Sequence, residues 1–118
     1  MDTIEGRQGR DMIDGDAGDD HIKGGRGNDY LHGSKGNDTI FGGRGNDLMT
    51  GGADNYRLYG GRGHDKIYGG TGEDVINGGT GRDILFGGAD GDTFIFQKGN
   101  RVDIVKDLNI VEDQIAVS

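Results

Sequence analysis

The chain has 118 residues, of which 27 are glycine, none is proline or cysteine, and only 31% are hydrophobic. The lack of cysteine excludes a disulfide framework and a thiolate metal site. The formal net charge of −8 favours divalent cations as partners and predicts no nucleic-acid partner. So few apolar side chains do not offset a backbone entropy of about 1–2 kcal/mol per ordered residue. We therefore expect disorder, or folding driven by a metal ion.

The N-terminal segment Asp2-Thr3-Ile4-Glu5 fits positions six to nine of a repeat whose first half is missing. The chain thus begins inside a repeat, as expected of a piece of a longer protein. Ile4-Glu5-Gly6-Arg7 also spells a protease-cleavage tag, but the repeat explains all four residues. The segment lacks the basic start and apolar stretch of a signal peptide. No run of apolar residues approaches the roughly 18–20 needed to span a membrane.

A nonapeptide repeat follows, because glycine recurs every nine residues from Gly6 to Gly87. With that glycine as position one, ten units run from Gly6 to Ile95. Position four is glycine except at Asp54 and Asp90. Position six is aspartate except at Tyr56. Position eight is always a large apolar residue: Ile13, Ile22, Leu31, Ile40, Met49, Leu58, Ile67, Ile76, Leu85 and Phe94.

Each unit predicts a glycine-rich turn over positions one to six and a very short strand over positions seven to nine. A strand of three residues is not stable alone, but copies stacked about 4.8 Å apart are. Two units would form one coil of 18 residues with strands in two opposed parallel sheets. The position-eight side chains would then point inward and form a thin core.

The last unit ends in Asp92-Thr93-Phe94-Ile95-Phe96, and a non-repetitive tail rich in apolar residues follows. We predict repeats over residues 1–96 and a capping segment over residues 97–118. A cap would cover the strand edges and the core of the last coil.

The turns suggest calcium, which takes six to eight oxygen ligands from carboxylates and backbone carbonyls. Glycine-rich turns expose carbonyl oxygens, and stacking places each position-six carboxylate beside the one 18 residues away. Like carboxylates at that distance repel, and a cation between them would turn the repulsion into a cross-link. A single Asp-Gly turn needs no such explanation, but nine aspartates in register do.

The pattern G-G-x-G-x-D-x-U-x, with U a large apolar residue, resembles the RTX (repeats-in-toxin) family over residues 2–96. The resemblance implies an all-β fold, a parallel β-roll that is a right-handed, β-helix-like solenoid. It also implies calcium held between neighbouring turns by position-six carboxylates and by carbonyls of positions two and four. The carboxylate ligands are Asp11, Asp29, Asp47, Asp65 and Asp83 on one edge and Asp20, Asp38, Asp74 and Asp92 on the other. The carbonyl ligands come from Gly25, Gly27, Gly36, Gly43, Gly45, Gly61, Gly63, Gly70, Gly72, Gly79 and Gly81.

Five turns on each edge leave four gaps, and hence up to eight calcium ions. Tyr56 interrupts one edge, so the gaps on either side of it are expected to be vacant, weak or rebuilt around Asp54. About six well-formed sites would remain. The alternative is that the phenol of Tyr56 lies over the loop and replaces an ion by packing.

By resemblance, the chain is a non-catalytic module of a secreted, extracellular protein exported by type I secretion machinery. Its host could be a toxin, protease, lipase, epimerase or adhesin. The module would fold on calcium binding outside the cell and support secretion and folding of its host. The alternative is a binding module for an acidic, alginate-like polysaccharide or a cell surface.

Two surface rows bear on that alternative. Arg26, Arg44 and Arg62 share position three and should stack, either to balance the acidic charge or to bind a polymer. The aromatic pairs Phe41 with Tyr59 and Tyr68 with Phe86 share position nine, for cross-strand stability or for docking.

The glycine-rich turns lack the Gly-Lys-Ser/Thr ending of a phosphate loop. His21, His32 and His64 share no position and pair with no nucleophile.

Overall fold

A computed structural model describes residues 2–96, 104–106 and 114–117. The described residues form thirteen strands and no helix. Nothing in this part of the chain is a helix long and apolar enough to cross a membrane.

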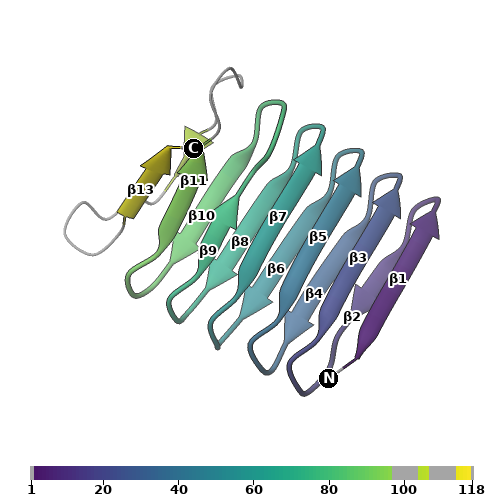
Figure 1. Cartoon of the computed structure of the whole chain (residues 1–118), viewed down its shortest axis with the longest axis horizontal. Coiled ribbons are helices and arrows are strands. Elements are labelled where there is room, and N and C mark those ends of the chain that lie inside the picture. Colours follow the sequence, from purple (N-terminus) through teal and green to yellow (C-terminus); the bar gives the residue numbers. More distant parts are fainter. Residues whose placement is uncertain (1, 97–103, 107–113, 118) are drawn as a thin grey trace.

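The strands alternate between two opposed parallel sheets, so the chain winds as a roll (Figure 1). The first sheet contains β1 (Thr3–Gln8), β3 (His21–Arg26), β5 (Thr39–Arg44), β7 (Arg57–Arg62), β9 (Val75–Asn77), β11 (Thr93–Phe96) and β13 (Gln114–Val117). The second contains β2 (Met12–Asp14), β4 (Tyr30–Ser34), β6 (Leu48–Gly52), β8 (Lys66–Gly70), β10 (Ile84–Gly88) and β12 (Ile104–Val105).

The repeat sets the register of both sheets. Ile22 pairs with Ile40 and Leu31 pairs with Met49, so residues 18 apart lie side by side. Thr3 pairs with His21 in the same register, which places residues 2–5 in the repeat. The predicted 18-residue coil, the parallel pairing and the β-roll are confirmed.

The core is thin, because each nonapeptide unit contributes one position-eight side chain to the space between the two sheets. From Ile22 to Phe94, every position-eight side chain has 0% exposure, and Ile4 and Ile13 are partly buried at the N-terminal end. Positions seven and nine face outward because side chains alternate along a strand. The two aromatic pairs on the outer faces stack, with ring centroids 4.9 Å apart for Phe41 and Tyr59 and 4.5 Å apart for Tyr68 and Phe86.

The prediction of three-residue strands is wrong for most units. In β3, β5 and β7 the strand continues through positions one to three and ends at an arginine. The strands lengthen because residues such as Gly25 and Gly43 also pair across the sheet. Glycine is therefore part of the ladder here and not only of the turn.

The tail adds one strand to each sheet. Ile84 pairs with Ile104 in β12, and Phe94 pairs with Ile115 in β13. Val105 packs against the core, whereas Ile115 is 54% exposed. The remainder of the predicted cap, 97–103, 107–113 and 118, lies outside the described residues.

Candidate metal centre

The glycine-rich turns line up along two edges of the roll, with a gap between each turn and the next on the same edge. The first edge contains the turns 6–11, 24–29, 42–47, 60–65 and 78–83. The second edge contains the turns 15–20, 33–38, 51–56, 69–74 and 87–92.

The position-six aspartates point into the roll. Eight of them are at most 3% exposed: Asp20, Asp29, Asp38, Asp47, Asp65, Asp74, Asp83 and Asp92. Positions six, eight and the next position one alternate along the chain, so all three face inward. This burial was not predicted, although the two-residue spacing between positions six and eight was the signal for it.

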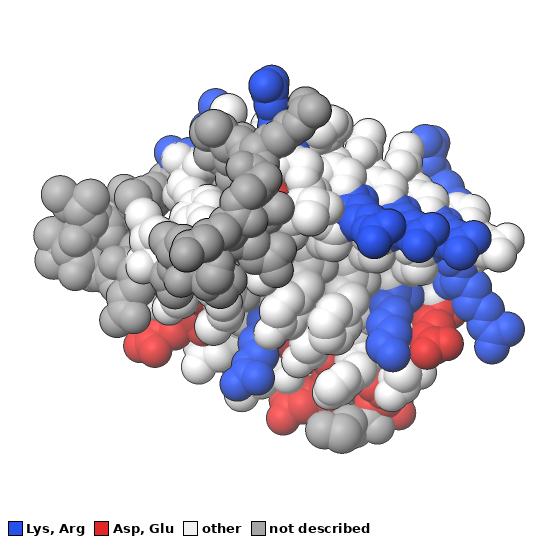
Figure 2. Space-filling view, turned by 45° about the horizontal axis from the view of Figure 1, so that its top comes forward, with Lys and Arg blue, Asp and Glu red and all other residues white. Residues whose placement is uncertain are grey.

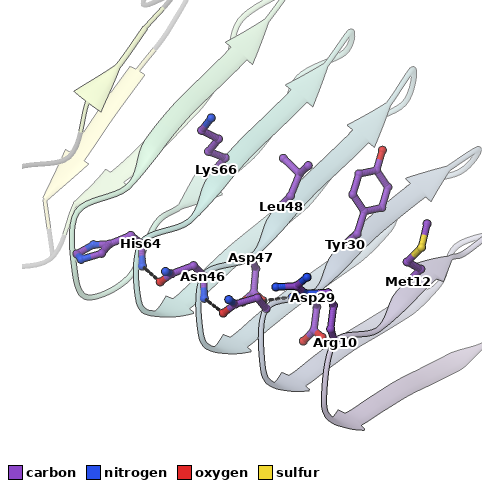
Figure 3. Close-up of a pocket in the computed structure, with 10 residues that line it drawn as sticks. Arg10, Met12, Asp29, Tyr30, Asn46, Asp47, Leu48, His64 and Lys66 are labelled. Atoms are coloured by element: carbon purple, nitrogen blue, oxygen red, sulfur yellow. Dashed lines mark hydrogen bonds between the residues drawn. The ribbon is translucent and has the colours of Figure 1, made fainter.

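In each carboxylate, one oxygen bonds to the neighbouring turn. Asp47 Oδ1 accepts a hydrogen bond from the Asp29 N–H at 2.9 Å, and Asp65 Oδ1 accepts one from the Asp47 N–H at 2.8 Å (Figure 3 draws the first). The same bond recurs on the second edge, where Asp38 Oδ1 accepts a hydrogen bond from the N–H of Asp20, 18 residues earlier. These bonds join successive turns on the same edge in the register of the repeat.

On several position-six aspartates the Oδ2 atom is buried without a hydrogen-bond partner. Such Oδ2 atoms belong to Asp11, Asp20, Asp29, Asp38, Asp47 and Asp74. Leaving a buried charged group unsatisfied costs more than the roughly 1–3 kcal/mol of a neutral one. Such a row of oxygens is a place for a cation.

Glycines complete the cradle around each gap. A Cβ at Gly24 would lie 2.5 Å from Asp29 Oδ2, so position one leaves room for the carboxylate. A Cβ at Gly43 would collide with the carbonyl oxygen of Gly25, and one at Gly45 with that of Gly27. The carbonyls of positions two and four in one turn therefore point at the next turn. Each gap is lined by carboxylate and carbonyl oxygens.

The electrostatics of the gaps disfavour bare carboxylates. Burial, reinforced by the charge of Asp29, raises the pKa of Asp47 to about 6. Burial, with the charges of Asp92 and Asp90, raises the pKa of Asp74 to about 7. The pKa of Asp38 is also raised, first by burial and then by neighbouring aspartates. A cation in the gap would reverse this preference.

The donor set fits calcium. Within the described residues, no three His, Cys, Asp or Glu side chains gather at one point. A gap therefore offers two carboxylates at most, with backbone carbonyls as the remaining donors. Calcium accepts such all-oxygen sets of six to eight ligands, whereas transition metals favour imidazole or thiolate.

Comparison with known families agrees with this chemistry. The family model described as the RTX calcium-binding nonapeptide repeat (4 copies) matches residues 1–31, 23–58 and 59–94. The chain belongs to the RTX repeat family. Repeats of this family are structural calcium-binding units and not catalytic ones, so the chain is a calcium-binding module. No curated protein matches it in sequence.

The RTX roll brings the predicted ligands together at the gaps, nine position-six aspartates and the glycines of positions two and four. Asp2 was predicted at position six of the first, partial unit but not as a ligand, and its N–H donates to Asp20 Oδ1 at 2.9 Å. The assignment of individual residues as calcium ligands stays a prediction.

A second ladder, which sequence reasoning missed, runs along position five. Asn28 Oδ1 accepts a hydrogen bond from the Asn46 N–H, and Asn46 Oδ1 accepts one from the His64 N–H, both at 2.8 Å (Figure 3). His64 Nδ1 then accepts one from the Arg82 N–H at 3.0 Å. His64 was interpreted as an ordinary exposed residue, but it takes the place of an asparagine. The recurrence of asparagine at position five was the available signal.

Tyr56 breaks the carboxylate ladder on the second edge. Its side chain is 1% exposed and belongs to the core cluster. Its N–H donates to Asp74 Oδ1 at 2.9 Å, as an aspartate there would. Its phenol, however, offers no carboxylate oxygen to the turn 33–38. Asp54, which we considered as a substitute ligand, accepts a hydrogen bond from the Gly36 N–H at 2.8 Å.

Proposed function

We propose that this RTX module folds when it binds calcium outside the cell and thereby supports the secretion and folding of a host exoprotein. The proposal rests above all on one observation, the row of buried Oδ2 atoms without hydrogen-bond partners. Those oxygens keep the calcium-free roll unfavourable at neutral pH. Extracellular calcium would remove the penalty.

The thin core supports the same proposal. One fully buried large apolar side chain contributes about 1.5–3 kcal/mol, and each nonapeptide from Gly15 onward buries one such side chain at position eight. Ordering the backbone costs about 1–2 kcal/mol for each of the nine residues. The hydrogen-bond ladders offset part of the difference, because each bond contributes about 0.5–1.5 kcal/mol. Calcium would supply the remainder by binding only the folded chain.

The proposed calcium sites are the gaps between successive turns on each edge. In each complete gap the carboxylates of two successive turns would hold the ion, with carbonyls of positions two and four. The ion would supply positive charge that joins two turns. Because each ion needs two ordered turns, binding and folding would be cooperative. Type I secretion machinery would act on the parent protein, whose unfolded calcium-free repeats would pass through it.

A calcium titration followed by circular dichroism tests the proposal. We expect a largely disordered chain in calcium-free buffer and a cooperative gain of β signal by millimolar calcium. Magnesium should substitute poorly, because it demands a tighter octahedral geometry and retains its waters. Equal folding by magnesium would argue against sites built on the gaps.

A second candidate function is the binding of an acidic polysaccharide by the arginine ladder. Arg26 pairs with Arg44 and Arg44 with Arg62, so the three arginines lie on neighbouring strands, with the strands about 5 Å apart. Figure 2 shows basic side chains gathered in such a row. Among residues 2–96, 104–106 and 114–117, the ion pair joins Lys23 to Glu5 and involves none of the ladder arginines. Guanidinium groups bind carboxylates through paired hydrogen bonds.

Binding to a uronate oligomer and to its neutral methyl ester would test the second candidate. Neutralising the three ladder arginines to glutamine should abolish binding of the charged oligomer. Neutralising three basic residues elsewhere should not, and a suitable control set is Arg10, Lys35 and Arg82.

A further inference from the structure

We propose that Tyr56 is a built-in replacement for a calcium ion: its phenol ties the turn 51–56 to the turn 33–38, in a gap that would otherwise need a cation. The inference rests on the calcium-driven folding proposed above. It adds that one coil of the second edge is cross-linked by the protein itself.

The ring of Tyr56 lies where carboxylates lie in the other turns. Its Cε1 atom is 2.5 Å from the position of a Cβ on Gly33, and its Cδ2 atom is 2.8 Å from that of a Cβ on Gly51. Both are position-one glycines. Gly33 also lies beside the Oδ2 atom of its own aspartate, Asp38, as Gly24 lies beside that of Asp29, whereas at Gly51 the ring takes the place of the carboxylate. The ring thus spans two successive turns from inside the roll.

The phenolic hydroxyl makes the cross-link. It donates a hydrogen bond to the carbonyl oxygen of Ser34. Ser34 occupies position two of the preceding turn, and the corresponding carbonyl of Gly25 points into its own gap. Tyr56 therefore satisfies the type of oxygen that calcium is expected to bind in the complete gaps.

The phenol also removes charge from this gap. Burial raises the pKa of Tyr56 to about 12, and the charges of Asp38, Asp54 and Asp74 act in the same direction. The side chain is therefore neutral at physiological pH. Asp38 is left as the only position-six carboxylate of the two turns.

Asp54 provides a second tie in the same gap through its bond from the Gly36 N–H. Asp90, the other aspartate at position four, accepts the same bond from the Gly72 N–H at 2.9 Å. This shared geometry indicates that an aspartate at position four ties two turns together. In this inference Asp54 has a structural role beside Tyr56, because its carboxylate joins the turn 51–56 to the turn 33–38.

The gap that follows, between the turns 51–56 and 69–74, holds one position-six carboxylate, that of Asp74, in place of the pair found in a complete gap. The second edge would therefore bind calcium in its two outer gaps only. The first edge, with an aspartate in every turn, would bind it in all four. Tyr56 thereby sets both the number of ions, about six in place of eight, and where the calcium ladder is interrupted.

Two substitutions in the full chain test the inference, with bound calcium counted by equilibrium dialysis and folding followed by circular dichroism. Tyr56→Asp should add one ion for each flanking gap and steepen the calcium dependence. Tyr56→Phe keeps the ring and loses the hydroxyl. It should leave the ion count unchanged and shift folding to higher calcium.

Tyr59→Asp is the matched control, because it makes the same chemical change on the outer face of β7 and should add no ion. Wild-type protein that folds with eight ions, or a Tyr56→Phe variant that gains ions or folds at unchanged calcium, would overturn the inference. If Tyr56→Asp does not fold, Tyr56→Phe still decides. A wild-type chain that ignores calcium would instead overturn the proposed function.

Discussion

A position-six aspartate has two structural roles that conflict unless a cation is present. Its Oδ1 atom receives an amide of the preceding turn, which requires the side chain to be buried. Burial then leaves an Oδ2 atom such as that of Asp47 in a site where negative charge is unfavourable. Calcium bound at Oδ2 would resolve the conflict, and so would protonation at lower pH.

Acid should therefore partly replace calcium. The raised pKa values of Asp47 and Asp74, about 6 and about 7, mean that the folded chain binds more protons than the unfolded chain at pH 4–6. The stability of the calcium-free roll is greatest below the unfolded pKa and falls as the pH rises through 6 and 7. In calcium-free buffer, circular dichroism should show more β structure at pH 5 than at pH 7.5. An unchanged or smaller signal at pH 5 would contradict the role of these carboxylates.

The sequence predicted the fold correctly where a repeated residue type has a single structural role. The apolar residues at position eight, such as Ile22 and Leu31, predicted the core, the two sheets and the register. It was less successful inside the turns, because glycine favours a turn and also permits close strand pairing. Tyr56 was recognised as a break in the pattern, but the inward path of its ring depends on the space beside Gly33 and Gly51, which only the three-dimensional structure shows.

At the scale of the elements, the position-five ladder should stabilise the roll whether or not calcium is bound. Asn46→Ala removes the acceptor of the His64 N–H and should lower the free energy of unfolding by about 1 kcal/mol. Asn46→Asp retains an acceptor oxygen and should cost less. Urea unfolding in saturating calcium measures both. Equal losses would show that the hydrogen bond is not what Asn46 contributes.

The last strands should matter as much as any repeat. Deleting residues 97–118 removes β12 and β13 and uncovers Leu85 and Phe94, both of which have 0% exposure in the intact chain. We expect the truncated repeats to need more calcium to fold, or not to fold. A calcium titration of both chains decides: if the midpoints coincide, the tail is not a cap.

Over the whole molecule, the ten nonapeptide units would account both for the proposed instability of the calcium-free chain and for its proposed folding on calcium binding. Each coil contacts mainly its neighbours, and every complete gap adds the same pair of carboxylates. The net charge of −8 adds a general repulsion that calcium would reduce. Folding is therefore expected to be a property of the entire roll and not of a local site.

The radius of gyration in solution tests this account most directly. Small-angle X-ray scattering in calcium-free buffer at pH 7.5 should give about 35 Å, the value for an unfolded chain of this length. Millimolar calcium should reduce it towards the 12.9 Å of the roll. A radius near the folded value in excess chelator would contradict the claim that calcium drives folding.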